Sequence, residues 1–172
     1  MRASEKLAEA INTQVGNEMF ASMKYLSIAS YFDSEALPTL ARFFFRQAEE
    51  ERAHAMKFLR FLLDVGAPVE IPAIAQPPSG FASAEEAVAM ALESEESVTA
   101  QIEELVHLAE QERNLSARNL LNWFLEEQLE EESTMGDLLA TVRRAGPDRL
   151  LDVETYLDRE AVNLVGEGTD EA

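Results

Sequence analysis

Apolar residues recur along most of the chain at alternating steps of three and four, the spacing that places them on one face of an α-helix. The pattern runs through four long stretches that contain almost no glycine or proline, at residues 5–33, 37–65, 83–112 and 115–145. At a rise of 1.5 Å per residue, each stretch makes a helix about 42 Å long. The pattern predicts an all-α protein with four long helices.

Local signals mark where these helices begin and end. Pro38 suits the first turn of the second helix, and Ser83 with Glu86 has the spacing of a capping box at the start of the third. Asn114 follows a polar break and suits the N-cap of the fourth helix. Gly146-Pro147 then ends that helix, because proline cannot continue it.

A long proline-rich segment separates the first two helices from the last two. Residues 66–82 include Pro68, Pro72, Pro77 and Pro78, so this segment cannot be helical throughout. The joints within each pair are short and predict two antiparallel hairpins. We therefore expect a four-helix bundle in which an extended crossover joins the hairpins.

The chain is long enough for one compact domain with a sizeable core. After the fourth helix we expect a short fifth helix over residues 148–160, with Asp148 as its cap, and an acidic tail over 161–172. There is no internal repeat and no sign of a second domain, so residues 1–172 are interpreted as a single domain.

The core-facing stripe of each long helix is apolar at both ends and polar in the middle. A glutamate lies near the midpoint of every helix, and midpoints meet at one level of a bundle whichever way the helices run. We therefore expect four carboxylates to converge. They are Glu18, Glu51, Glu95 and Glu131, and the other polar members of the stripes include Gln14, Gln47, His54, Thr99 and Gln128.

Converging carboxylates need compensation, because burying even one unpaired charge costs several kcal/mol. Protons, buried basic residues or metal ions could each supply it. The stripes contain no lysine or arginine, which favours metal. Glu51 and His54 lie at positions i and i+3, where both can reach one ion or bridge two. Carboxylates with one imidazole and no sulfur suit iron or manganese, and zinc can bind as well.

A second group of acids lies beside the first. Glu50 precedes Glu51, and Glu127 and Glu130 are one turn apart on the fourth helix. One interpretation is a solvated face. The other is a third, more weakly held metal position formed by Glu50, Glu127 and Glu130.

The chain is strongly acidic, with 33 acidic and 14 basic residues and a formal net charge of −19. Such a surface repels nucleic acids and anionic membranes and attracts cations, although solubility alone could explain the charge. No stretch approaches the roughly 18 apolar residues of a membrane helix. Cysteine is absent, which excludes disulfides and thiolate metal sites. The N-terminus lacks a signal-peptide pattern, and we expect a cytoplasmic protein.

Over about residues 5–160 the sequence resembles the bacterial non-haem ferritins, specifically the actinobacterial type. The motifs that carry the resemblance are specific in combination. They are Asn17-Glu18, Tyr31-Phe32-Asp33-Ser34-Glu35, Glu50-Glu51-Arg52-Ala53-His54-Ala55-Met56, Val69-Glu70-Ile71-Pro72 and Asn122-Trp123-Phe124-Leu125-Glu126-Glu127-Gln128.

The resemblance implies a ferritin-like bundle with a ferroxidase centre for two irons per subunit. Its implied ligands are Glu18, Glu51 and His54 on one iron, and Glu51, Glu95 and Glu131 around the second, with Gln128 nearby and Tyr25 beside the centre. It also implies a third iron site at Glu50, Glu127 and Glu130. The implied activity is iron storage, in which O₂ or peroxide oxidises Fe(II) and ferric mineral is deposited inside a hollow shell of 24 subunits.

Two differences distinguish this chain from the bacterioferritins, a sister family that binds haem. Bacterioferritins have a second Glu-x-x-His on the fourth helix, and a haem-ligating methionine where this chain has Arg52, so we expect no haem.

Two other functions are consistent with a helical bundle that has a polar core. A small di-iron oxidase would need an apolar substrate pocket beside the metals, and a purely structural bundle would bind no stoichiometric metal.

Overall fold

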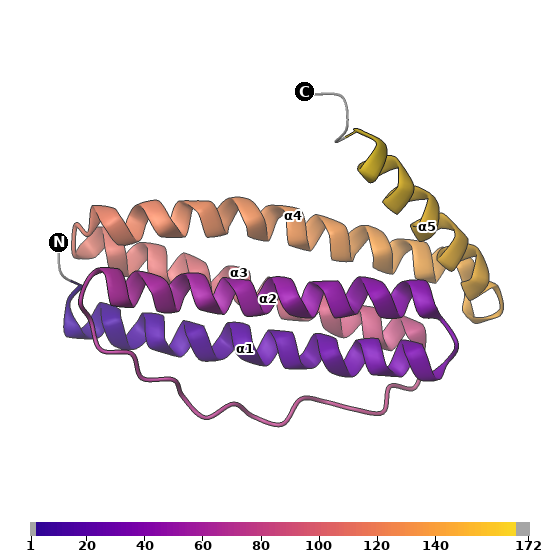
Figure 1. Ribbon diagram of the computed structural model, residues 1–172, viewed down its shortest axis with the longest axis horizontal. Helices are drawn as coiled ribbons and strands as arrows, with labels where there is room; N and C mark the ends of the chain where they lie inside the picture. Colours follow the sequence, from indigo (N-terminus) through magenta and orange to yellow (C-terminus); the bar gives the residue numbers. More distant parts are fainter. Residues whose placement is uncertain (1–2, 168–172) are drawn as a thin grey trace.

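The computed structural model describes residues 3–167, and it describes side chains as far as residue 159. The four long helices form a bundle of two antiparallel hairpins (Figure 1). This arrangement confirms the predicted fold class. The helices are α1 (Glu5–Ser34), α2 (Pro38–Asp64), α3 (Ala84–Gln111) and α4 (Leu115–Ala145), and α5 (Leu150–Glu167) follows a single 3-10 turn.

The helix ends follow the local signals in the sequence. Pro38 is the first residue of α2, and the Asn114 side chain caps α4 by accepting a hydrogen bond from the Ala117 amide at 3.1 Å. The Ser83 hydroxyl caps α3 by accepting from the Glu86 amide at 3.1 Å. Each bound of α1 to α4 lies within one residue of its predicted position.

The fifth helix differs from its prediction. Asp148 lies inside the 3-10 turn Pro147–Arg149, and α5 begins at Leu150 and continues through Glu167. The predicted end near residue 160 is therefore wrong. No proline or glycine occurs between Pro147 and Gly166, so nothing local stops the helix. Of the expected tail, residues 168–172 lie outside the described part of the chain.

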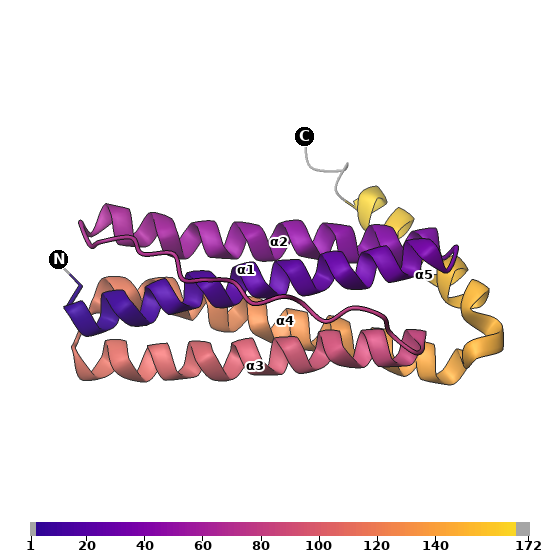
Figure 2. The same ribbon diagram turned by 90° about the horizontal axis from the view of Figure 1, so that it is seen from below.

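An extended crossover runs along α1 for most of the length of the bundle (Figures 1 and 2). Asn12 holds its first part, because its side-chain nitrogen donates to the Pro68 carbonyl at 3.0 Å and its oxygen accepts from the Glu70 amide at 2.7 Å. A Cβ atom on Gly16 would lie 2.3 Å from Pro72 Cγ. Glycine is therefore needed at this close approach of the crossover to α1.

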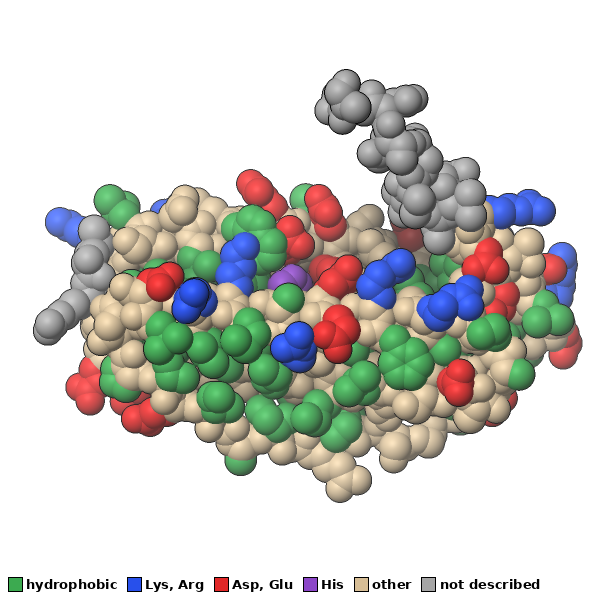
Figure 3. All heavy atoms as spheres, in the orientation of Figure 1, with side chains coloured by type: hydrophobic (Ala, Val, Ile, Leu, Met, Phe, Trp, Pro, Cys, Tyr) green, Lys and Arg blue, Asp and Glu red, His purple; other side chains and the backbone are tan. Residues whose placement is uncertain are grey.

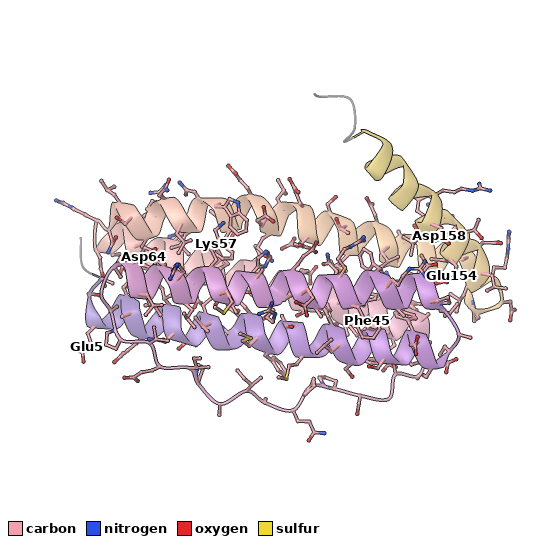
Figure 4. The ribbon with its side chains drawn as sticks, viewed as in Figure 1. Glu5, Phe45, Lys57, Asp64, Glu154 and Asp158 are labelled. Atoms are coloured by element: carbon pink, nitrogen blue, oxygen red, sulfur yellow. The ribbon has the colours of Figure 1, made fainter. Side chains whose placement is uncertain are left out.

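Helix α5 supplies a cap that α2 lacks. The N-cap residue of α2 is Leu37, whose side chain accepts no hydrogen bond. Glu154 of α5 is buried at that point, and its two oxygens accept from the Thr39 and Leu40 amides, both at 2.8 Å. Asp158, one turn further along α5, pairs with Arg42 at 2.9 Å (Figure 4). These contacts tie α5 to the N-terminus of α2.

The core consists of two apolar clusters with a polar layer between them along the helices. One cluster lies toward α5 and includes Phe32, Leu40 and Phe44. The other lies toward the chain's N-terminus and includes Ile11 and Phe58. The predicted change from apolar to polar and back along each stripe is thus reproduced in space.

The outer surface of α1 and α2 is unusually apolar for an exposed face. Met23, Leu26, Phe45 and Met56 are each 42–43% exposed, and Figure 3 shows hydrophobic side chains gathered over these two helices. We call these four residues the apolar strip. None of the described helices is both long and apolar enough to cross a membrane.

Candidate metal centre

Three of the predicted site residues form a compact group in the polar layer. Glu18 comes from α1, and Glu51 and His54 come from one face of α2. One ligand atom from each lies within 4.8 Å of the others, and no other group of three acidic or histidine side chains is so close among residues 3–159. Glu18 and Glu51 are fully buried, and His54 is 5% exposed.

These three side chains leave several polar atoms without hydrogen bonds. The unpaired atoms are Glu18 Oε2, both carboxylate oxygens of Glu51 and His54 Nδ1. Buried polar groups nearly always find partners in proteins, because an unsatisfied one costs about 1–3 kcal/mol. A cation would satisfy all of these atoms together. Glu51 Oε2 lies 3.5 Å from His54 Nδ1. Because neither oxygen of Glu51 accepts a hydrogen bond, this carboxylate can contact two ions at once.

The neighbouring acids from α3 and α4 are arranged differently. Tyr25 donates a hydrogen bond to one oxygen of Glu95, and Gln128 donates to the other at 3.1 Å. Glu131 is 9% exposed and makes no hydrogen bond that the structure records. Glu51, Glu95 and Glu131 do not form a group as close as the first one.

Burial makes the charged form of every acid in this layer unfavourable. It is the main cause of the raised pKa values of Glu18 and Glu51, and the neighbouring carboxylate charge is the next. The pKa of Glu95 is also raised by burial, although the hydrogen bonds from Tyr25 and Gln128 oppose the rise. Burial, followed by the charges of Glu95 and Glu50, raises the pKa of Glu131 to about 8.

Basic side chains balance these acids only in part, because the charges of His54 and Lys24 oppose the rise in the pKa of Glu95. No lysine or arginine is buried among residues 3–159. Lys24 is half-buried, and its pKa is lowered by burial, although the charges of Glu95 and Glu51 favour its charged form. Of the three ways to neutralise the site, protons and metal ions remain. Protons can neutralise these carboxyl groups when no cation is bound, and a bound cation would replace them.

The three acids of the predicted third position lie beside the centre without forming a close group. Glu50 and Glu127 are half-buried, and their charges contribute to the raised pKa of Glu131. Glu130 is exposed. The Gln47 amide donates to Glu50. A third metal position here stays a prediction.

The structure also places residues at the centre that sequence reasoning had not assigned. Gln14 is 2% exposed, and its amide nitrogen donates to Glu18 Oε1 at 2.8 Å. It belongs to the polar part of the α1 stripe, so the sequence contained a signal for it. The Trp123 ring lies edge-on to His54, with ring centroids 5.7 Å apart. Lys57, on α2, places its ammonium 3.2 Å from the Trp123 ring centroid (Figure 4).

Two antiparallel hairpins, a long crossover and a buried carboxylate–imidazole group define a ferritin-like metal-binding bundle. A family model described as a ferritin-like domain matches residues 8–145. The chain therefore belongs to the ferritin family.

Similar proteins support the same assignment. Ferritin BfrB of Mycobacterium tuberculosis (strain ATCC 35801 / TMC 107 / Erdman) is 40% identical over 155 residues, which cover 90% of this chain and 85% of that protein. A bacterial non-heme ferritin of Staphylococcus aureus (strain USA300) is 37% identical, covering 84% of this chain and 87% of that protein. An open-pore ferritin from the hyperthermophilic archaeon Archaeoglobus fulgidus has a TM-score of 0.87 and 38% identity, covering 90% of this chain and 96% of that chain. These relatives confirm the resemblance inferred from the motifs and support a role in iron storage.

Proposed function

We propose that this protein oxidises Fe(II) at a di-iron centre inside each subunit and stores the ferric product as mineral within a hollow shell. Glu18 and His54 bind one iron, Glu51 bridges both, and Glu95 and Glu131 bind the second. Gln128 and Tyr25 hold Glu95. Glu50, Glu127 and Glu130 form a third, weaker iron position on the way out of the centre.

The observation that carries the proposal is the set of unpaired atoms on Glu18, Glu51 and His54. A purely structural bundle would gain stability by pairing these atoms or replacing them with apolar groups. Hard oxygen ligands with one imidazole suit iron. Their negative charge also stabilises Fe³⁺ more than Fe²⁺, which favours oxidation of the bound metal.

The electron count fits a two-iron site. Two Fe²⁺ ions release one electron each, and O₂ takes up both electrons with two protons to form hydrogen peroxide. Peroxide can in turn accept two electrons and two protons to form two water molecules. Glu51 can change its mode of binding as the iron charge rises, because neither of its oxygens is held by a hydrogen bond.

The proposal of a shell draws on the apolar strip and on the family. Met23, Leu26, Phe45 and Met56 expose apolar surface on one face of α1 and α2, and such surfaces commonly mark contacts between subunits. The excess of 33 acidic over 14 basic residues would attract iron and help mineral to nucleate. We propose the 24-subunit assembly of the family for this chain.

The test is aerobic addition of Fe²⁺ to the iron-free protein. The rate is followed by the rise of ferric absorption in the near ultraviolet, and gel filtration with iron detection then gives the particle size and the iron per particle. We expect fast oxidation, and hundreds of irons eluting with a large shell. Oxidation that stops near two or three irons per chain would instead indicate a dedicated di-iron oxidase.

Two variants on α2 distinguish the effect of the proposed site from a general effect of surface charge. Glu51→Ala removes the bridging carboxylate, whereas Glu49→Ala removes an exposed carboxylate that only pairs with Arg52. We expect Glu49→Ala to oxidise iron at the wild-type rate and Glu51→Ala to lose fast oxidation. Equal rates in the two variants would exclude the proposed centre.

A further inference from the structure

Gln14 makes three hydrogen bonds that fix its position and the orientation of its amide. Its nitrogen donates to Glu18 Oε1 at 2.8 Å and to Gln101 Oε1 at 3.2 Å. Its oxygen accepts from the Asn17 side-chain nitrogen at 3.1 Å. The Gln101 nitrogen donates onward to the exposed Ser97 hydroxyl at 3.2 Å. A directed chain of amides therefore connects the surface between α1 and α3 to a buried carboxylate.

We propose that Gln14, held by Asn17 and Gln101, is a positioning residue that makes Glu18 a one-oxygen ligand. Because Gln14 occupies Oε1, only Oε2 of Glu18 is left unpaired. Oε2 is thereby directed into the group that Glu18 forms with Glu51 and His54. This inference rests on the proposed function, because it concerns metal bound by that group.

The contrast with Glu51 shows why the contact matters. Both oxygens of Glu51 lack hydrogen bonds, so Glu51 can move between ions. Glu18, by contrast, would be fixed at one oxygen throughout the reaction. Residues that hold a ligand from behind typically change metal affinity about 10–100-fold when they are removed. A fixed Glu18 also leaves a coordination position open for the oxidant, which a two-oxygen contact would fill.

The orientation of the Gln14 amide is decided by its outer partners. Asn17 presents a donor to the Gln14 oxygen, and Gln101 presents an acceptor to its nitrogen. A reversed amide would place an oxygen against the Glu18 carboxylate and lose all three hydrogen bonds. Both outer residues are half-buried, so they can be changed without opening the apolar core.

The test uses Co²⁺ as a probe, because its visible absorption weakens as the coordination number rises and O₂ does not consume it under these conditions. Iron-free wild-type protein, Gln14→Leu, Asn17→Ala and Gln101→Leu are titrated with Co²⁺. Circular dichroism and thermal unfolding of each variant report the fold. The KM and kcat for Fe²⁺ are measured in parallel on the same samples.

We expect Gln14→Leu to bind the first Co²⁺ about tenfold more weakly, because Glu18 is no longer held in place. Its visible band should also be weaker, because the freed Oε1 of Glu18 can then contact the ion and raise the coordination number. Asn17→Ala and Gln101→Leu should shift affinity and spectrum in the same direction by a smaller factor. The rise in KM for Fe²⁺ should exceed the fall in kcat. A folded Gln14→Leu variant with wild-type affinity and spectrum overturns the proposal. If Gln14→Leu does not fold, wild-type behaviour of both other variants overturns it.

The two proposals fail in different ways. If wild-type protein binds no Co²⁺ and oxidises no iron at the centre, the metal site itself is wrong and the inference falls with it. If wild-type protein binds Co²⁺ and the three variants match it, only the positioning role is wrong.

Discussion

The acidic side chains that the two hairpins contribute to the polar layer differ in their hydrogen bonding. On α1 and α2, Glu18, Glu51 and His54 stand close together with four polar atoms unpaired. On α3 and α4, Glu95 already accepts hydrogen bonds through both oxygens. The first hairpin therefore has ligand atoms free for a cation. In the second hairpin Glu131 has no hydrogen bond to lose, but a cation at Glu95 would have to displace or share one of the hydrogen bonds from Tyr25 and Gln128. This difference predicts that the two proposed metal positions fill one after the other.

The largest effect should come from removing the residue that both positions share. Glu51→Ala takes away a fully buried carboxylate whose two oxygens both lack hydrogen bonds, so both proposed positions should be lost together. We expect iron oxidation to slow by at least about 100-fold. Stopped-flow absorbance measures the rate. Loss of one position with the other intact would show that Glu51 does not bridge.

The next largest effect is a dependence of protein stability on pH, caused mainly by Glu131 on the second hairpin. The pKa of Glu131 is about 8 in the folded protein against an ordinary value of 4.5, so the folded state keeps a proton that the unfolded state loses between these values. The Glu131 carboxyl should therefore make the metal-free protein less stable as pH rises from about 4.5 to about 8. The raised pKa values of Glu18, Glu51 and Glu95 act in the same direction.

Thermal unfolding across this pH range measures the effect, and we expect a decrease of several degrees. Glu131→Gln keeps the shape of the side chain but cannot ionise, so its unfolding temperature should depend less steeply on pH. Saturating metal should flatten the wild-type curve, because the cation replaces the proton. An identical pH slope in wild type and Glu131→Gln would contradict the assigned pKa.

A smaller effect is expected when the hydrogen bond from Tyr25 to Glu95 is removed, and it should change only the second metal position. Tyr25→Phe removes the hydroxyl that donates to Glu95, which frees one oxygen of that carboxylate for metal. Hydrogen bonds to charged groups contribute about 1.5–3 kcal/mol, so we expect the second binding constant to rise by about tenfold. Calorimetric titration with Zn²⁺ resolves the two steps. The first Zn²⁺-binding constant should not change. A change in the first constant alone would contradict the assignment of Glu95 to the second metal position.

The smallest effect should leave both metal positions untouched. Glu154→Ala removes the cap that α5 provides for α2, at a cost of about 1–2 kcal/mol in the free energy of unfolding. Urea unfolding measures that cost. Both metal-binding constants should equal those of wild type. A matching loss of metal affinity would mean that the centre depends on general stability rather than on its own ligands.

Features with local causes were predictable from the sequence. The starts of α2, α3 and α4 follow from Pro38, Ser83 and Asn114, and the end of α4 follows from Gly146. Each of these residues acts on backbone groups within a turn. The meeting of Glu18, Glu51 and His54 follows from helical spacing and from hairpin geometry. Their function as ligands remains a prediction, as do the roles of Glu95 and Glu131.

Features that depend on contacts between distant residues were not predictable. The use of Glu154 as a cap requires knowing that α5 reaches residues 39–40. The hydrogen bonds to Glu95 depend on the positions that Tyr25 and Gln128 take across the bundle. The end of α5 was predicted too early because the acidic composition of the last residues suggested a tail. The helix continues because no residue there breaks it before Gly166.

The long crossover also bears on the order of events during folding. Each hairpin closes through a short joint, whereas docking of the two hairpins must first order the crossover, and ordering a longer loop is slower. The group of Glu18, Glu51 and His54 belongs wholly to the first hairpin, so it can exist before docking. Trp123, the only tryptophan, reaches His54 from the second hairpin. In refolding with Co²⁺ present, cobalt absorption should therefore appear before the tryptophan fluorescence change that reports docking, and the reverse order would show that a metal-binding site arises only in the finished bundle.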